Sequence, residues 1–135
     1  MEYRKNMAWE IVDGLLYVLH ETEAVDESAW RDFLAYVEAQ PRINGILVFG
    51  RWVKPDAHQR NDVRRIHDRF GTKLAIITDS KLTMGVLTAI RWFGVPVRGF
   101  RDDQIAEAHA FLGREDMVEQ GTKLLAPYLS AAPEA

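Results

Sequence analysis

Apolar residues follow two kinds of pattern along the chain: short continuous runs that are typical of strands, and repeats of three to four residues that are typical of helices. The first two runs, 8–12 and 15–20, flank the dipeptide Asp13-Gly14. Asp-Gly between two β-prone runs favours a type I′ turn, which needs positive φ at both central positions. The pattern therefore predicts that the fold opens with an antiparallel hairpin.

Strand-like runs and helical repeats alternate after the hairpin. The predicted strands are 46–50, 73–78 and 97–100, and the predicted helices are 26–40, 59–70, 80–93 and 103–112. Asp26 or Ser28 caps the first of these helices. Alternating strands and helices imply right-handed crossovers, so the order predicts one α/β domain with a mostly parallel sheet and an antiparallel N-terminal edge.

The C-terminal part of the chain departs from this alternation. Apolar positions at helical spacing predict one more helix near 115–125. Pro127 is expected to end or bend it, because proline lacks the amide proton and crowds the preceding turn. The last five residues, 131–135, are expected to fray.

Length and composition narrow the class of protein. The chain has 135 residues and a mass of 15.5 kDa, which suits one domain. It has no cysteine, which excludes disulfides, thiolate metal sites and cysteine nucleophiles. Its apolar runs are far shorter than the ~20 residues of a membrane span, and the charged N-terminus does not match a signal peptide. We therefore expect a cytoplasmic protein without a membrane span.

The net charge of −3 is unevenly distributed. Residues 1–50 carry a net charge of −5, residues 51–100 carry +6, and residues 101–135 carry −4. A basic middle between acidic ends predicts an acidic partner. The alternative is that the basic residues form a solvated face with no partner, which would have the same distribution of charge.

A family resemblance rests on the order and spacing of these elements. The residues that carry it are the Asp13-Gly14 turn, the strand 45–50, the stretch 73–80 with the helix that follows it to Gly94, and the strand 97–100 with Asp102-Asp103 and the helix that ends at Leu112. Together they resemble a STAS-like domain, the fold of bacterial anti-sigma-factor antagonists, in particular its SpoIIAA-like branch. The resemblance covers residues 8–112 and leaves 113–135 as a C-terminal helical extension.

The resemblance implies a regulatory protein-binding module without enzymatic activity or a cofactor. Partner-switching members of the family carry a phosphorylatable Ser or Thr at the start of the helix after the third strand. The corresponding stretch here, 50–60, contains neither residue, so phosphorylation at that place is not expected. The alternative is a small-ligand or lipid carrier, because a related carrier fold is grouped with this branch.

One candidate site lies where the predicted strands end. Ligands of open α/β sheets bind beyond the carboxyl ends of the parallel strands. The residues predicted to bind a ligand or anion there are Arg51, Trp52, Lys54, Asp79, Ser80 and Arg101. Basic groups beside a helix N-terminus favour an anion or a phosphopeptide. In the alternative, Ser80 and Asp102 only cap helices and Arg51 pairs with Asp79.

A second candidate site lies on the predicted helix 80–93. Its outer face is partly apolar, and its predicted partner-binding residues are Met84, Leu87, Thr88, Arg91 and Trp92. Met, Trp and Arg are enriched in interface cores. A protein partner, a second copy of the chain, or the chain's own segment 115–129 could cover this face.

Other chemistries lack a matching pattern. The four histidines have no metal-ligand spacing, and the sequence contains no nucleophile elbow, Walker motif or dinucleotide fingerprint. The arginine-rich stretch 60–69 invites a nucleic-acid interpretation, but Asp62 and Asp68 can pair with Arg65 and Arg64 at helical spacing. We therefore expect no catalytic residues, no metal, and no nucleic-acid partner.

Overall fold

A computed structural model describes residues 2–4, 6–21, 24–50, 56–78 and 94–130 of the chain. The strands are β1 (Glu2–Arg4), β2 (Met7–Val12), β3 (Leu15–His20), β4 (Ile46–Gly50), β5 (Leu74–Ile77) and β6 (Val97–Phe100). The helices are α1 (Glu27–Glu38), α2 (Ala57–Phe70), α4 (Ile105–Phe111) and α5 (Val118–Ser130), with the 3₁₀ turn η1 (Glu115–Met117) before α5. The predicted helix 80–93 lies outside the described residues.

The strands form one six-stranded sheet in the order of the chain, β1 to β6. β1, β2 and β3 pair antiparallel, whereas β3, β4, β5 and β6 pair parallel. Asp13 and Gly14 take φ values of 50° and 82°, as a primed hairpin turn requires. The predicted α/β fold, with its antiparallel start and mostly parallel sheet, is confirmed.

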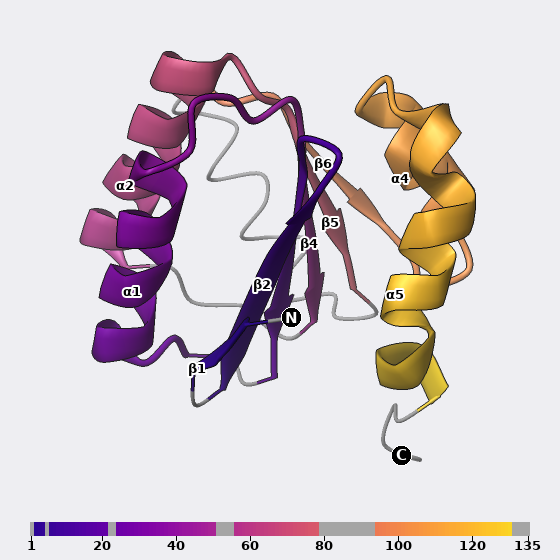
Figure 1. The fold of residues 1–135 in the computed structure, drawn as a ribbon, viewed down its shortest axis with the longest axis horizontal. Coiled ribbons are helices and arrows are strands. Elements are labelled where there is room, and N and C mark those ends of the chain that lie inside the picture. Colours follow the sequence, from indigo (N-terminus) through magenta and orange to yellow (C-terminus); the bar gives the residue numbers. More distant parts are fainter. Residues whose placement is uncertain (1, 5, 22–23, 51–55, 79–93, 131–135) are drawn as a thin grey trace.

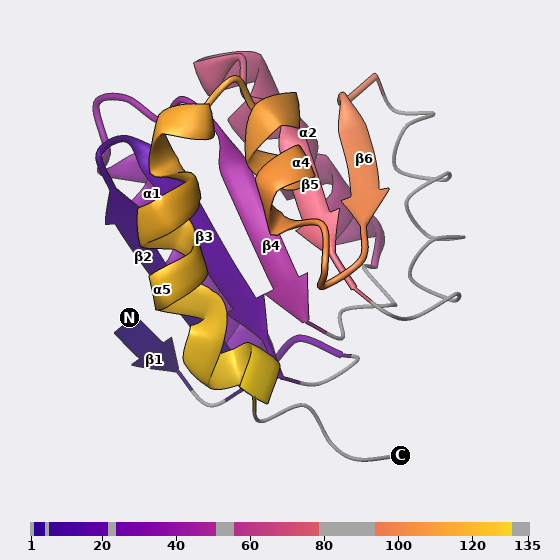
Figure 2. The same ribbon diagram turned by 90° about the vertical axis from the view of Figure 1, so that its right-hand side faces the viewer.

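Helices cover both faces of this sheet. Figure 1 shows α1 and α2 side by side on one face, and α4 and α5 on the other. In the perpendicular view of Figure 2, α5 crosses in front of β3, while β6 forms the far edge of the sheet. The chain therefore builds three layers, helix–sheet–helix.

Strand β3 shows why both faces need a helical layer. All six of its residues are buried. Leu16 and Val18 belong to the core between the sheet and α1 and α2, whereas Leu15 and Tyr17 belong to the core beneath α4 and α5. A strand that buries both sets of alternate side chains cannot face water on either side.

Local caps fix where the helices on the first face begin. The Asp26 side chain accepts a hydrogen bond from the Ala29 amide at 3.0 Å, so Asp26, and not Ser28, caps α1. A capping box joins Asp56 to Gln59, and α2 therefore begins at Ala57, earlier than predicted.

Two features of the chain ends differ from the prediction. β1 was not predicted, because its three residues contain no apolar run, and it joins the sheet by antiparallel pairing with β2. The last helix continues through Pro127 to Ser130, so the expectation that Pro127 ends it is wrong. Pro127 is exposed and lies in the final turn, where the preceding carbonyls can bond to water.

The C-terminal segment contributes to the second core. Met117 and Leu125 are buried there with residues of β3, β4 and β5. Gly121 lets α5 approach closely, because a Cβ atom at this position would lie 2.3 Å from His109 Nε2 and 2.7 Å from the Tyr17 hydroxyl. The described part of the predicted extension, residues 113–130, therefore packs on the face of the sheet that lies opposite α1 and α2 (Figure 1).

Substitution of Gly121 tests this close approach. In an exposed helix, Gly→Ala stabilises by about 1 kcal/mol through helix propensity. We expect Gly121→Ala instead to lower the free energy of unfolding by ~1–3 kcal/mol, as overpacking of a core does. The measurement is urea unfolding, with exposed Thr122→Ala on the same helix as the control. A stabilised Gly121→Ala variant would contradict the packing of α5 described above.

Candidate functional site

The carboxyl ends of the parallel strands meet at one edge, as the strand-end site requires. Phe49, Ile77 and Phe100 are in register at the ends of β4, β5 and β6. The predicted site residues in the connections after β4 and β5 lie outside the described residues: Arg51, Trp52, Lys54, Asp79 and Ser80. Their role in ligand or anion binding stays a prediction.

Arg101 is the predicted site residue that the structure describes. It follows β6, is exposed, and its Nε lies 3.3 Å from Asp103 Oδ1. Its amide donates to Gln104 Oε1 at 2.9 Å. Gln104 is the N-cap residue of α4 and makes no side-chain cap. The expectation that Asp102 caps this helix is therefore wrong, because the chain makes a tight turn after β6 and α4 begins two residues later than predicted.

The predicted partner-binding face of the third helix lies wholly outside the described residues: Met84, Leu87, Thr88, Arg91 and Trp92. The structure does show where the C-terminal segment goes. It packs against Tyr17 and His109, as described above.

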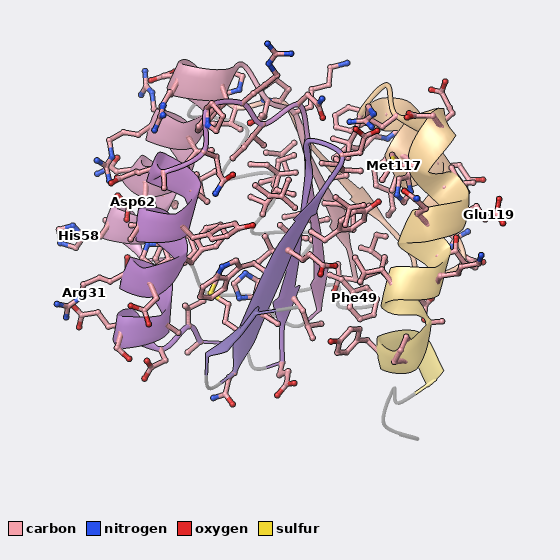
Figure 3. The ribbon with its side chains drawn as sticks, in the orientation of Figure 1. Arg31, Phe49, His58, Asp62, Met117 and Glu119 are labelled. Atoms are coloured by element: carbon pink, nitrogen blue, oxygen red, sulfur yellow. The ribbon has the colours of Figure 1, made fainter. Side chains whose placement is uncertain are left out.

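A groove between α1 and α2 is a further candidate site that the sequence did not reveal. It has a volume of about 270 Å³, and the side chains lining it are Leu34, Val37, Glu38, Asp62, Arg65, Ile66, Arg69 and Phe70. The apolar side chains come from both helices, and the charged ones include two carboxylates and two guanidinium groups. Figure 3 shows Arg31 and His58 pointing away from the sheet on this side of the molecule, where Asp62 also lies.

Hydrogen bonds between the two helices close the groove at both ends. At one end, Trp30 Nε1 donates to Asp62 Oδ2 at 2.8 Å. At the other, the Arg69 guanidinium donates to the carbonyl oxygens of Glu38 and Gln40, at 2.9 and 3.1 Å. The first bond joins the first turn of α1 to the second turn of α2, and the second joins the ends of the two helices, so α1 and α2 run parallel. These bonds link the two helices on either side of the groove.

The buried histidines take part in the fold. His109 Nδ1 lies 2.8 Å from the Ile105 carbonyl oxygen, and His109 Nε2 lies 2.9 Å from the Tyr17 hydroxyl. A carbonyl can only accept, so Nδ1 carries the proton, and neutral Nε2 accepts from Tyr17. Burial lowers the pKa of His109 and raises that of Tyr17 to about 12. Burial also lowers the pKa of His20, on the other face of the sheet, to about 3.

The described residues contain no group of three or more His, Asp or Glu side chains that could hold a metal ion. His67 Nδ1 lies 2.6 Å from the Thr72 carbonyl oxygen, at the end of α2. In the described part of the chain, His67 and His109 thus bond to backbone carbonyl groups, and His20 is buried.

Comparisons with protein-family models, with curated proteins and with solved structures found no match to this chain. Within the described ranges, no helix is long and apolar enough to cross a membrane. The architecture and the α1–α2 groove are therefore the observations on which a function can be argued.

Acidification tests the buried histidines. His20 and His109 have lowered pKa values in the folded protein, so the unfolded chain binds more protons as the pH falls below 6.5. The contribution of these two histidines to stability is thus fully present above pH 6.5 and falls on acidification, by about 1.4 kcal/mol per pH unit for each histidine that stays neutral. Urea unfolding between pH 7 and 5 measures this slope.

The matched variant is His109→Gln, which removes one of the two titrating groups. We expect it to reduce the slope by about half, because His20 still titrates. A wild-type free energy of unfolding that does not change between pH 7 and 5 would contradict the buried, neutral state of both imidazoles.

Proposed function

We propose that the chain is a non-enzymatic regulatory module that binds protein, with the STAS-like architecture of anti-sigma-factor antagonists. The observation that supports this proposal most directly is the α1–α2 groove. It combines apolar side chains such as Leu34 and Ile66 with a charged rim, the composition that recognition sites for protein segments share. We further propose that the protein acts in the cytoplasm.

The chemistry of the described side chains favours a binding role over catalysis. The buried imidazole of His109 is engaged by Tyr17 and Ile105 inside the core, beneath Gly121, where a substrate has no access. The groove, by contrast, is open to solvent and bounded by side chains that suit recognition: an exposed carboxylate at Glu38 and an exposed guanidinium at Arg65.

A lipid or small-ligand carrier is less well supported. The hollow between the sheet and the helices α1 and α2 measures about 20 Å³ and includes Val18, His20 and Phe33 in its lining. A single water needs roughly 10–15 Å³, so this cavity holds one water and not an acyl chain.

Capture from source cells that are chemically cross-linked before lysis, so that weak complexes survive dilution, tests the proposal. The baits are the tagged wild type, Leu34→Asp in the groove, and Ala110→Asp, an exposed position on α4, as the matched control. We expect wild type and Ala110→Asp to retain the same protein, which includes the cell's own untagged copy if that is the partner. Leu34→Asp should lose it, because a carboxylate replaces the apolar contact.

Far-UV circular dichroism must show that all three baits are folded, and exposed Glu38→Arg serves as a second groove variant in case Leu34→Asp does not fold. Retention of the same protein by the groove variants, or no retained protein with any bait, would contradict the proposed function.

A further inference from the structure

We propose that the partner in the α1–α2 groove is a second copy of the chain, bound about a two-fold axis that runs along the groove between the helices. This inference rests on the proposed function, because it names the partner of the same surface. It follows from how charge is divided between the two helices that form the groove.

The two helices carry opposite net charge. α1 contains three acidic residues and one basic residue, whereas α2 contains four basic residues and two acidic ones. Exposed members of the two sets include Glu27 and Glu38 on α1, and Arg64 and Arg65 on α2. A helix of net negative charge therefore lies beside one of net positive charge, with the apolar side chains of the groove between them; within α1, Glu27 is paired with Arg31 at 3.2 Å.

A surface of this kind is complementary to its own copy in one orientation. A two-fold interface places the same patch on both copies, so that residue i meets j and j meets i. An axis along the groove lays α1 of one copy on α2 of the other. The dimer then contains two equivalent contacts, each between the acidic helix of one copy and the basic helix of the other. An axis across the groove would lay α2 on α2, which sets arginine against arginine.

The hydrogen bonds between α1 and α2 show which residues of the two helices lie at the same position along the groove, and these residues face one another across the dimer. Arg69 binds the Glu38 carbonyl oxygen, and Arg65 precedes Arg69 by one turn on the same side of α2. Glu38 of one copy accordingly faces the Arg65–Arg69 turn of the other. Arg65 also pairs with Asp62 in its own chain, but 64% of its side-chain surface is exposed, so it can contact a carboxylate across the interface.

The size of the surface predicts a weak dimer. At 1.5 Å per residue and 8–10 Å between axes, the two helices cover about 400 Å² per copy, roughly half of a standard interface. We therefore expect association in the upper micromolar range or weaker, visible when concentration is varied.

Charge exchange at Glu38 and Arg65 tests the geometry by sedimentation equilibrium of the full chain between 10 µM and 1 mM. The wild-type mass should rise from the 15.5 kDa of the monomer toward twice that value. Glu38→Arg alone and Arg65→Glu alone should each raise the dissociation constant by at least about tenfold, because each homodimer then holds two like-charge contacts.

Two combinations should restore association to within about threefold of the wild type. In the double variant Glu38→Arg/Arg65→Glu both contacts are again of opposite charge. In an equimolar mixture of the two single variants, the mixed dimer also pairs opposite charges at both contacts, one with exchanged residues and one as in the wild type. The control is Glu107→Arg on α4, which should associate like the wild type.

A wild type that stays monomeric at 1 mM would overturn the inference, as would association that the single variants leave unchanged or that the two combinations do not restore. These results would leave the proposed function standing if the groove variants still lose a different captured protein. If the groove variants also retained that captured protein, both the dimer and the proposed function would be contradicted.

Discussion

Burial of β3 on both faces is the constraint on which the rest of the structure depends. The strand lies inside the sheet between β2 and β4, and none of its residues reaches solvent. Each face must therefore be covered by helices, and α1 and α2 on one side and α4 and α5 on the other meet that need (Figure 1). The strand also carries two polar side chains, Tyr17 and His20, into these cores. The Tyr17 hydroxyl binds His109, and this bond ties the second helical layer to the sheet.

This constraint also determines where recognition can occur. Polar groups that enter the two cores are held neutral by burial, as the shifted pKa values of Tyr17, His20 and His109 show. The exposed charges lie on the outer surfaces of the helices instead. On α1 and α2 these charges surround the apolar side chains of the groove, and the bonds of Trp30 and Arg69 link the two helices there. The proposed binding role rests on that surface rather than on any group in the core.

The sequence predicted the parts of the fold that depend on local signals. Asp13-Gly14 specified the hairpin, the continuous apolar runs specified β4 and β5, and Asp26, one of the two predicted caps, begins α1. Other parts depend on contacts between distant residues. β1 joins by backbone pairing that leaves no apolar pattern, and Gly121 meets Tyr17 and His109 only once the sheet and helices are assembled.

The candidate sites show the same division. The topology brings the ends of β4, β5 and β6 to one edge, as the strand order implied, yet only Arg101 of that predicted site belongs to the described residues. The α1–α2 groove could not be predicted, because it depends on how far apart two helices lie on the sheet. In the sequence, its residues belong to two separate helical repeats, as apolar positions expected to face the core and polar positions expected to face solvent. The contrast in charge between those helices was the signal that could have indicated it.

Amide chemical shifts of the ¹⁵N-labelled chain, recorded at 20 µM and at 1 mM, test the central claim most directly, because they locate self-association residue by residue. The account predicts concentration-dependent shifts confined to the outer surface of α1 and α2, including Arg31, Leu34, Glu38 and Arg65, with α4 and α5 unchanged. Spectra that do not change with concentration, or shifts centred on α4 and α5, would contradict it.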